Sequence, residues 1–434
     1  MNETPNENGQ QPARDDAGGL AQIESAFELV TIRLPVLATF AALVIGLGLG
    51  VVLAAANLPE WLLQTASLVG TLWLRALQMT IIPLVAALLV LGLTQMVRAA
   101  SAGAAARRFL MLVFAVLIAG GVFTALFMPV LLGLFPIPES ASGFLANGGG
   151  EAQEVPDILD FLGSLIAPNI IAAAAETSML PLTIFFALFA VAITRVPAAQ
   201  SEVLMRFFHA LANAMLVVIG WVLWLAPVGV AALAFGVGLR SGGGAFAALG
   251  HYILVVSACG AFVLLLGYAI AAVLGGIGPV RFAKAMIPAQ AVAVSTQSSL
   301  ASLPAMLDSA SRLGLRSSTS EFVLPLAVAI FRATSPAMNM AVALYVAALA
   351  GVEITPALAV AGILVALIIS VGSVSLPGSI SFVVSIGPIA LAMGIPIEPL
   401  VLLVAVEMLP DIMRTLANVT MNVAVASAVD RSRN

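Results

Sequence analysis

Hydrophobic residues are grouped along this chain into long runs, and short segments between the runs carry most of the polar residues. The runs cover approximately residues 34–56, 61–97, 109–135, 159–194, 207–235, 246–278, 282–306, 319–350, 354–392 and 396–428. A helix of about 20 apolar residues spans a bilayer, so each run is long enough to enter or cross a membrane. Several runs are so long that they must be tilted, kinked or folded back. The pattern predicts an all-α polytopic membrane protein.

Two runs, 282–306 and 354–392, are interrupted near mid-length by Ser, Pro and Gly. Proline removes a backbone donor and glycine weakens a helix, so each run is expected to break into two half-helices. A half-helix that ends inside the membrane leaves backbone groups that a substrate or an ion can satisfy, and paired breaks are typical of secondary transporters. The alternative is a pair of kinks in ordinary spanning helices.

The composition strengthens the membrane assignment. Of 434 residues, 62% are hydrophobic and only 9% are charged, against roughly a quarter in ordinary soluble domains. These values exclude a water-soluble enzyme, and the formal net charge of −4 gives no reason to expect a nucleic-acid partner. The single cysteine, Cys259, excludes disulfides within the chain and any multi-cysteine metal site. No prosthetic cofactor is expected.

The charges in the loops predict the orientation. Basic residues gather in some loops, and acidic residues dominate others, such as 139–160 and the positions of Glu353 and Glu398. By the positive-inside rule the basic loops face the cytoplasm, and both termini then lie there as well. Eight transmembrane helices plus two re-entrant hairpins satisfy the even number of crossings that this requires. A multi-pass protein of the plasma (cell inner) membrane is expected.

The last run carries six polar residues at helical spacing: Glu407, Asp411, Arg414, Thr415, Asn418 and Asn422. At about 100° per residue they share one face of a helix. Ionisable groups inside a membrane normally face a cavity or a partner. An acid suits an ammonium group and an arginine grips a carboxylate with parallel N–H bonds, so the face fits a zwitterion with an extra carboxylate. Alternatively, Asp411 and Arg414 only neutralise each other at i and i+3.

Several stretches resemble the dicarboxylate/amino acid:cation symporters, a family that includes archaeal aspartate transporters and the excitatory amino acid transporters. STQSSLASLP (295–304) and SVGSVSLPG (370–378) look like the tips of the family's two re-entrant hairpins. DIMRTLANVTMN (411–422) resembles the final helix, and PNIIAAAAETSMLPLTIFFALF (168–189) resembles the fourth. VLPL (323–326) matches the opening of the seventh helix. The likeness extends from about residue 30 to the end of the chain.

The resemblance implies a homotrimer in which each protomer has a trimerisation scaffold and a transport domain that moves like an elevator. The implied division is a disordered cytoplasmic tail at 1–30, scaffold helices 1–2 at 31–100, helix 3 of the transport domain at 101–135, scaffold helices 4–5 at 136–240, the remaining transport domain at 241–428 and a cytoplasmic tail at 429–434.

The resemblance also assigns substrate binding to Ser298, Ser299, Ser335, Leu376, Gly378, Asp411, Arg414, Thr415 and Asn418. Asp411 matches the aspartate that binds the amino group of the substrate, and Arg414 matches the arginine that binds its side-chain carboxylate. Ser299 matches the tip serine that contacts the α-carboxylate. Ser335 stands where the family has a threonine, provided that the register from VLPL to Pro377-Gly378 has no gap.

The sodium sites depart from the family pattern. In the ungapped register the family's Asn-Met-Asp falls on Phe331-Arg332-Ala333, and its second sodium aspartate is Asn422. Asn339-Met340 matches only with compensating gaps, and residues 109–122 lack the family's Thr and Ser. The residues proposed for cation coupling are Ser370, Val371, Ser373, Asn418, Asn422, Arg332 and Glu407, with a possible sodium site near Ser373.

Two charged residues have open interpretations. Arg332 lies in the middle of an apolar run, where an unpaired charge costs about 3 kcal/mol or more. One hypothesis is that its guanidinium replaces sodium as a built-in cation, and the alternative is an arginine that snorkels or pairs with the scaffold. Glu407 is either a proton carrier or a carboxylate that only lines a cavity.

The expected function is secondary active symport of an acidic amino acid or dicarboxylate, such as aspartate, glutamate or succinate. Na⁺ or H⁺ is the expected coupling ion, in a scheme altered from the usual multi-sodium one. The expected partners are the small anionic substrate, the lipid bilayer and two further copies of the chain. One alternative is a substrate-gated anion channel on the same scaffold. A membrane-embedded hydrolase using Ser298 or Ser299 is weaker, because Lys284, the only lysine, lies at the entrance of a hairpin.

Overall fold

The structure is a computed structural model that describes residues 35–54, 56, 58–100, 103–138, 163, 165–241, 244–372 and 378–431. Within these ranges the chain is helical and contains no strand. The helices up to residue 273 are α2 (Val36–Leu53), α3 (Glu60–Ala100), α4 (Ala104–Leu134), α6 (Ile170–Ala175), α7 (Met179–Ile193), α8 (Ala198–Trp224), α9 (Ala226–Ser241) and α10 (Gly244–Val273). The later helices are α11 (Pro279–Thr296), α12 (Leu303–Leu313), α13 (Ser317–Ile330), α14 (Ser335–Ala350), α15 (Pro356–Gly372), α16 (Gly378–Ala392), α17 (Glu398–Val404) and α18 (Met408–Arg431).

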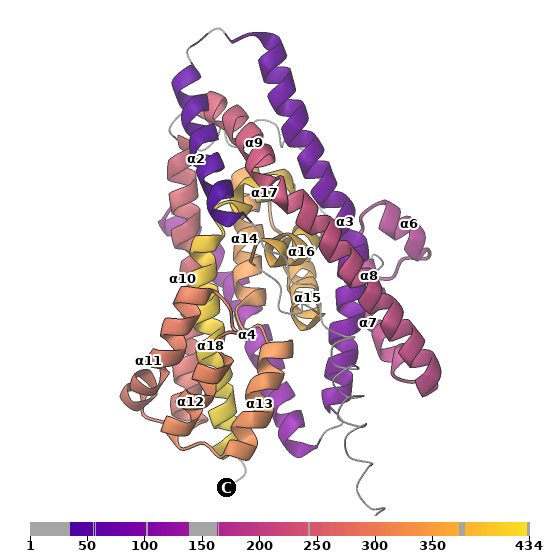
Figure 1. Cartoon of the computed structure of the whole chain (residues 1–434), viewed down its shortest axis with the longest axis vertical. Coiled ribbons are helices and arrows are strands. Elements are labelled where there is room, and N and C mark those ends of the chain that lie inside the picture. The colour runs from indigo at the N-terminus through magenta and orange to yellow at the C-terminus, as the bar shows by residue number, and fades with distance from the viewer. Residues whose placement is uncertain are drawn as a thin grey trace, which may run out of the picture.

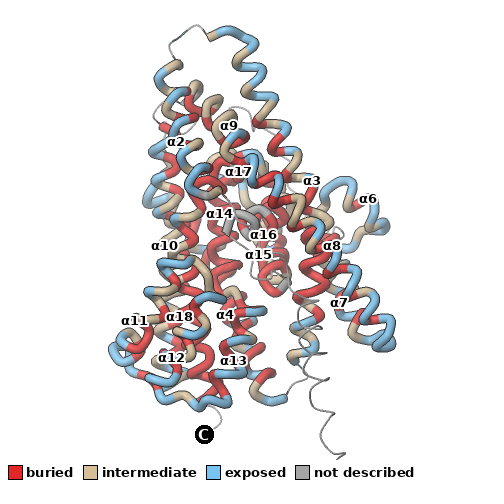
Figure 2. Tube along the Cα trace, in the orientation of Figure 1, coloured by how far each residue is buried: buried red, intermediate tan, exposed pale blue. Residues whose placement is uncertain are grey.

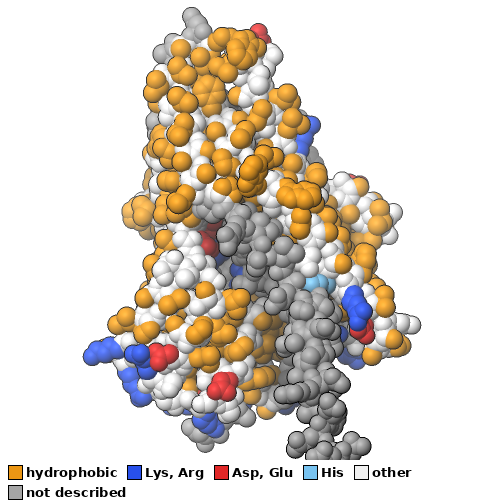
Figure 3. All heavy atoms as spheres, viewed as in Figure 1, with side chains coloured by type: hydrophobic (Ala, Val, Ile, Leu, Met, Phe, Trp, Pro, Cys, Tyr) orange, Lys and Arg blue, Asp and Glu red, His pale blue; other side chains and the backbone are white. Residues whose placement is uncertain are grey.

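Six helical segments of the described chain are long and apolar enough to cross a membrane: Glu60–Ala100, Ala104–Leu134, Ala198–Trp224, Gly244–Val273, Ser317–Ala350 and Met408–Arg431. Hydrophobic side chains cover much of the surface in Figure 3, and most charged side chains in that view lie toward its lower end. The predicted all-α polytopic class is therefore confirmed. The count of eight crossings, the re-entrance of the two hairpins and the domain boundaries stay predictions.

Three helices of the second half of the chain, α14, α16 and α17, lie near the centre of the molecule (Figure 1). α2 packs along α9, and α3 packs against both α8 and α9. In Figure 1 these helices occupy the upper end and the right side, whereas α11, α12 and α13 form the lower end. α14, α16 and α17 lie between, and α14 and α18 are the most completely buried of the long helices (Figure 2). The buried polar residues of the last run are therefore enclosed by other helices.

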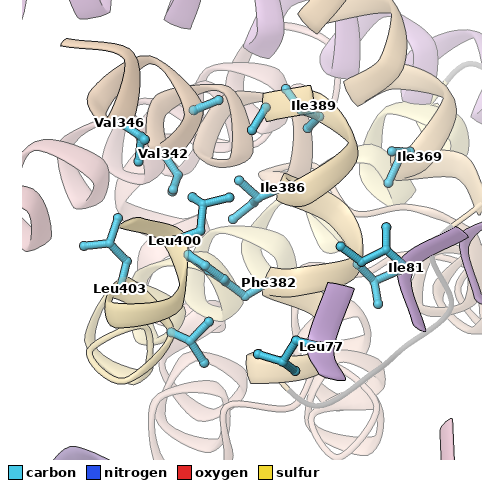
Figure 4. Packing of buried hydrophobic residues seen from close by; sticks show 14 of the residues in the cluster. Leu77, Ile81, Val342, Val346, Ile369, Phe382, Ile386, Ile389, Leu400 and Leu403 are labelled. Atoms are coloured by element: carbon cyan, nitrogen blue, oxygen red, sulfur yellow. The ribbon is translucent and has the colours of Figure 1, made fainter. Parts of the chain in front are cut away.

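Packing at the centre joins α3 to the last third of the chain. Leu77 and Ile81 of α3 lie beside Phe382 and Ile386 of α16 and Leu400 of α17, and all five are buried (Figure 4). Lipid tails are as apolar as these side chains, so close packing rather than escape from water holds such helices together in a bilayer. This cluster fixes the start of α17, and with it the approach of the chain to α18.

Each of the two interrupted runs is divided into two helices. α11 and α12 pack against each other, and Gln297 between them has a left-handed backbone with φ 50°. α15 and α16 likewise pack against each other. Residues 373–377 lie outside the described residues, and so do two positions of the expected site, Ser373 and Leu376.

Two further runs are broken at positions that the sequence did not indicate. The 319–350 run is interrupted at Phe331–Thr334, and the 396–428 run is interrupted at Ala405–Glu407. Each break precedes a proline, Pro336 or Pro410. A proline cannot donate to the carbonyl four residues earlier and its ring clashes with that carbonyl. Arg332 and Glu407 therefore lie outside helices, which corrects the placement of Glu407 on one helix face with Asp411 and of Arg332 within a helix.

Candidate functional site

The first turns of α18 hold a buried cluster of charge. Asp411 and Arg414 are less than a tenth exposed, and Glu407, in the turn before α18, is only 2% exposed. The guanidinium of Arg414 pairs with both acids: its Nη2 lies 2.7 Å from Glu407 Oε1, and its Nε lies 3.4 Å from Asp411 Oδ1. The spacing in the sequence predicted that these three side chains share one side of the structure, and the structure brings them together.

A second element completes the surroundings of Arg414. Its Nη1 donates to Asn339 Oδ1 at 2.8 Å, and Asn339 Nδ2 donates to Ser335 Oγ at 2.9 Å. Both partners lie in the first turns of α14 and are buried. A guanidinium has five N–H donors, two on each Nη and one on Nε. Each Nη therefore keeps one N–H that donates to none of the described residues, besides its bond to Asn339 or Glu407.

Tyr252 of α10 reaches the same cluster from a third side. Its hydroxyl donates to Glu407 Oε2 at 3.0 Å, and its side chain is fully buried. The two oxygens of Glu407 thus have different partners, Arg414 on one and Tyr252 on the other. The carboxylate is held in one orientation by an ion pair and a hydrogen bond, away from bulk water.

The break between α13 and α14 is tied to α18 by Asn418. The Oδ1 of Asn418 accepts hydrogen bonds from the backbone N–H of Thr334 at 2.9 Å and from its hydroxyl at 3.0 Å. Arg332 lies in the same non-helical segment, is half-buried, and interacts electrostatically with Asp411 and Arg414. The site therefore holds two acids and two arginines, whose formal charges balance. Balance of this kind lowers the cost of charge at membrane depth.

Three other residues proposed for cation coupling, Asn422, Ser370 and Val371, are buried. Asn422 is fully buried, and neither atom of its amide has a hydrogen-bond partner among the described residues. Ser370 is fully buried at the end of α15, where its hydroxyl donates to the carbonyl of Ala366 at 2.5 Å, and Val371 is also buried. Ser373 lies outside the described residues, so the sodium site proposed near it stays a prediction.

Four other residues proposed to bind substrate lie outside the hydrogen-bonded cluster around Arg414 among the described residues. Ser298 and Ser299 lie half-buried between α11 and α12, where Ser298 Oγ accepts from the N–H of Ala301 at 3.2 Å. Gly378 is the first residue of α16, and Thr415 is buried on α18. No hydrogen bond among the described residues links these four positions to Arg414. Their roles in substrate binding stay predictions.

The sequence did not indicate the contact of Tyr252 with Glu407 or that of Thr334 with Asn418. Tyr252 is one of only three tyrosines in the chain, and a buried tyrosine hydroxyl usually finds a partner. That scarcity was the available signal, but it does not point to Glu407, 155 residues away. Thr334 gave no signal, because its role depends on a helix break that the apolar pattern conceals. The sequence indicated Asn339 only as a possible sodium ligand.

Comparison with known proteins identifies relatives over most of the chain. Residues 36–432 match the model of the sodium:dicarboxylate symporter family. The chain is 26% identical to the proton/sodium-glutamate symport protein of Bacillus subtilis, over 90% of this chain and 91% of that protein. It is 27% identical to the neutral amino acid transporter B(0) of Homo sapiens, over 89% and 77%, respectively. Identity to the proton/glutamate-aspartate symporter of Escherichia coli is 29%, over 61% and 60%.

The helical fold and these matches define a multi-pass membrane transporter and not an enzyme. The chain belongs to the sodium:dicarboxylate symporter family. The resemblance in the sequence motifs is thereby confirmed, and the family and the names of the relatives support amino acid symport with Na⁺ or H⁺ as the coupling ion.

Proposed function

We propose that this chain moves an acidic amino acid or dicarboxylate, such as aspartate, glutamate or succinate, across the plasma membrane. In this proposal it works as a homotrimer by an elevator motion of residues 101–135 and 241–428, with both termini in the cytoplasm. The observation that carries the substrate class is Arg414, a buried arginine that keeps one N–H on each Nη. Two such N–H groups match the two oxygens of a carboxylate.

The neighbouring residues supply the other contacts of the proposed substrate. Asp411 lies on the Nε side of Arg414 and would bind an ammonium group. Ser335 is held by Asn339, which also holds Arg414, so a substrate near Arg414 is near this hydroxyl as well. A dicarboxylate has no ammonium group for Asp411 to bind, so the site favours an acidic amino acid. Of the three relatives named above, two are named for glutamate and one is a neutral amino acid transporter.

The charge balance supports coupling to a single positive charge. Without substrate, the formal charges of the two acids and the two arginines cancel. An acidic amino acid carries one net negative charge, so the occupied site has one net negative charge. A proton on Glu407 restores the balance and also frees the Nη2 of Arg414 for the substrate. Arg332 then serves as the built-in cation that replaces one sodium ion. A sodium ion near Ser373 is the alternative source of the charge.

Uptake by proteoliposomes tests the substrate assignment. Labelled aspartate, glutamate, succinate and alanine would be offered under separate sodium and proton gradients. We expect saturable uptake of the acidic amino acids and no uptake by Arg414→Ala, with Arg195→Ala, an exposed arginine outside the site, as the matched control. Failure of every acid to enter, or unchanged uptake by Arg414→Ala, would overturn the proposal.

The coupling ion is tested with Glu407→Gln, which keeps the shape of the side chain and removes its charge. The matched control is Glu353→Gln, because Glu353 is exposed. An inward proton gradient is expected to stimulate uptake by the wild type and by this control. Uptake by Glu407→Gln should persist without that stimulation. If a sodium gradient alone drives the wild type and the proton gradient has no effect, Glu407 is not the proton carrier.

A further inference from the structure

A cavity of about 590 Å³ lies between α3, α9 and the start of α17, away from the charged cluster around Arg414. Part of its lining is apolar and includes Leu63, Leu233, Phe235 and Leu402. The lining also carries five polar side chains: Ser67, Thr71, Arg75 and Gln78 from α3, and Glu398 from α17. In Figure 1 the region lies in the upper half of the molecule, where α9 and α17 are neighbours.

The four polar residues of α3 form one stripe. Their spacing is 4, 4 and 3 residues, which at about 100° per residue keeps them within roughly 80° of the helix circumference. None of the five polar side chains makes a hydrogen bond or an ion pair with another described residue. Among the described residues Arg75, on a helix long and apolar enough to cross a membrane, thus has no anionic partner, and Glu398 in the same cavity has no cationic one.

The face of α3 next to the polar stripe indicates which kind of molecule can enter this cavity. Leu68, Leu72 and Met79 each follow a stripe residue by one position and are strongly exposed. This face of α3 is apolar, directly beside the polar stripe, and belongs to a helix that is apolar enough to cross a membrane. A molecule with a charged head and hydrocarbon chains can therefore place its chains on that face and its head in the cavity.

We propose that the cavity binds the head of a phospholipid that carries a phosphate and a primary ammonium, the ethanolamine type. Arg75 and the donors Gln78 and Thr71 suit the phosphate, since arginine binds phosphate oxygens with paired N–H bonds. Glu398 suits the ammonium, which has three N–H donors. A free amino acid offers the same two charges, but it is small for a cavity of about 590 Å³ and has no hydrocarbon chains to contact the apolar part of the lining.

Such a lipid would contact two parts of the chain at once. α3 and α9 supply most of the lining, whereas Glu398, Pro399 and Leu402 belong to α17, which leads into the turn that holds Glu407. The bound head would therefore stabilise the position of α17 against α3 and α9. This inference goes beyond the proposed transport activity and does not depend on it, because lipid binding is measured without any gradient.

Native mass spectrometry of the full chain tests the proposal. Delipidated protein would be mixed with equal amounts of phosphatidylethanolamine, phosphatidylcholine and phosphatidylglycerol of matched chains. We expect one phosphatidylethanolamine to be retained per chain in preference to phosphatidylcholine, whose quaternary ammonium has no N–H donor. Glu398→Gln should remove that preference. Arg75→Gln should weaken retention roughly tenfold, the effect of losing one charge-assisted hydrogen bond. Arg195→Gln and Glu353→Gln, exposed residues outside the cavity, are the matched controls.

Equal retention of the ethanolamine and choline lipids by the wild type would overturn the proposal, and so would unchanged retention by both cavity variants. A second saturable binding site for labelled glutamate that is lost in Arg75→Gln would show that the occupant is an amino acid instead. If Arg75→Gln does not fold, the lipid comparison in the wild type and in Glu398→Gln still decides.

Discussion

Asn339 joins two residues of the proposed substrate site, because its carbonyl accepts from Arg414 and its amide donates to Ser335. Asn339→Ala leaves both partners buried without this bond, and each lost hydrogen bond costs about 1 kcal/mol or more. We expect the KM for the acidic substrate to rise roughly tenfold, with smaller effects on the amount of folded protein. Uptake kinetics in proteoliposomes measure this. Thr94→Val is the control, since that buried hydroxyl has no hydrogen-bond partner among the described residues; a KM equal to that of the control would contradict the role of Asn339.

Arg332 contributes one of the two positive charges of the site. Arg332→Gln leaves Glu407 and Asp411 facing Arg414 alone, so the empty site has one net negative charge. An external cation is then expected to replace the lost charge, and uptake should become dependent on sodium at concentrations that have little effect on the wild type. The measurement is uptake against sodium concentration at constant ionic strength. Unchanged uptake and unchanged sodium dependence would show that Arg332 does not act as a built-in cation.

At the scale of the helix, α2 and α9 approach each other so closely that glycine is required. A Cβ at Gly50 would collide with the backbone of Phe235 and Gly238, whereas a Cβ at Gly48, on the other side of the same helix, would meet nothing within 4 Å. Gly50→Ala is therefore expected to destabilise the protein by about 1–3 kcal/mol, and Gly48→Ala should be neutral or slightly stabilising. Thermal unfolding in detergent compares the two. Equal midpoints would contradict the close contact of α2 and α9.

The sequence alone predicts the positions of most helices but not the breaks within them. Runs of apolar residues located the helices, because a membrane-crossing helix needs little else. They did not locate the breaks before Pro336 and Pro410, since a proline inside a helix is also tolerated: Pro83 and Pro129 lie within α3 and α4. The break before Pro336 is held by Asn418, 84 residues from Thr334, and no local pattern contains that contact.

The site was predicted to the extent that it is local. Asp411, Arg414 and Asn418 share a helix, and their spacing places them on one face. The partners of Arg414 were not predictable in this way, because Glu407 lies in a turn outside the helix and Asn339 lies 75 residues away. Packing between helices chooses those partners, and spacing along the chain carries no information about it.

The whole molecule has an orientation that one labelling experiment can test. Gln200 is exposed in the first turn of α8, between Arg195, which precedes the helix, and Arg206, which lies within it. Glu353 is exposed in the loop after α14. By the positive-inside rule a cysteine at Gln200 faces the cytoplasm and a cysteine at Glu353 faces outward. Background labelling should be low, because the native Cys259 is fully buried.

Intact cells would be treated with a membrane-impermeant maleimide before and after permeabilisation. We expect Glu353→Cys to be labelled in intact cells and Gln200→Cys to be labelled only after permeabilisation, while the wild type stays unlabelled in both. The reverse pattern would place both termini outside. Labelling of both variants in intact cells would place the two positions on the same side, which contradicts the odd number of crossings expected between them, namely α8, α10 and the Ser317–Ala350 segment.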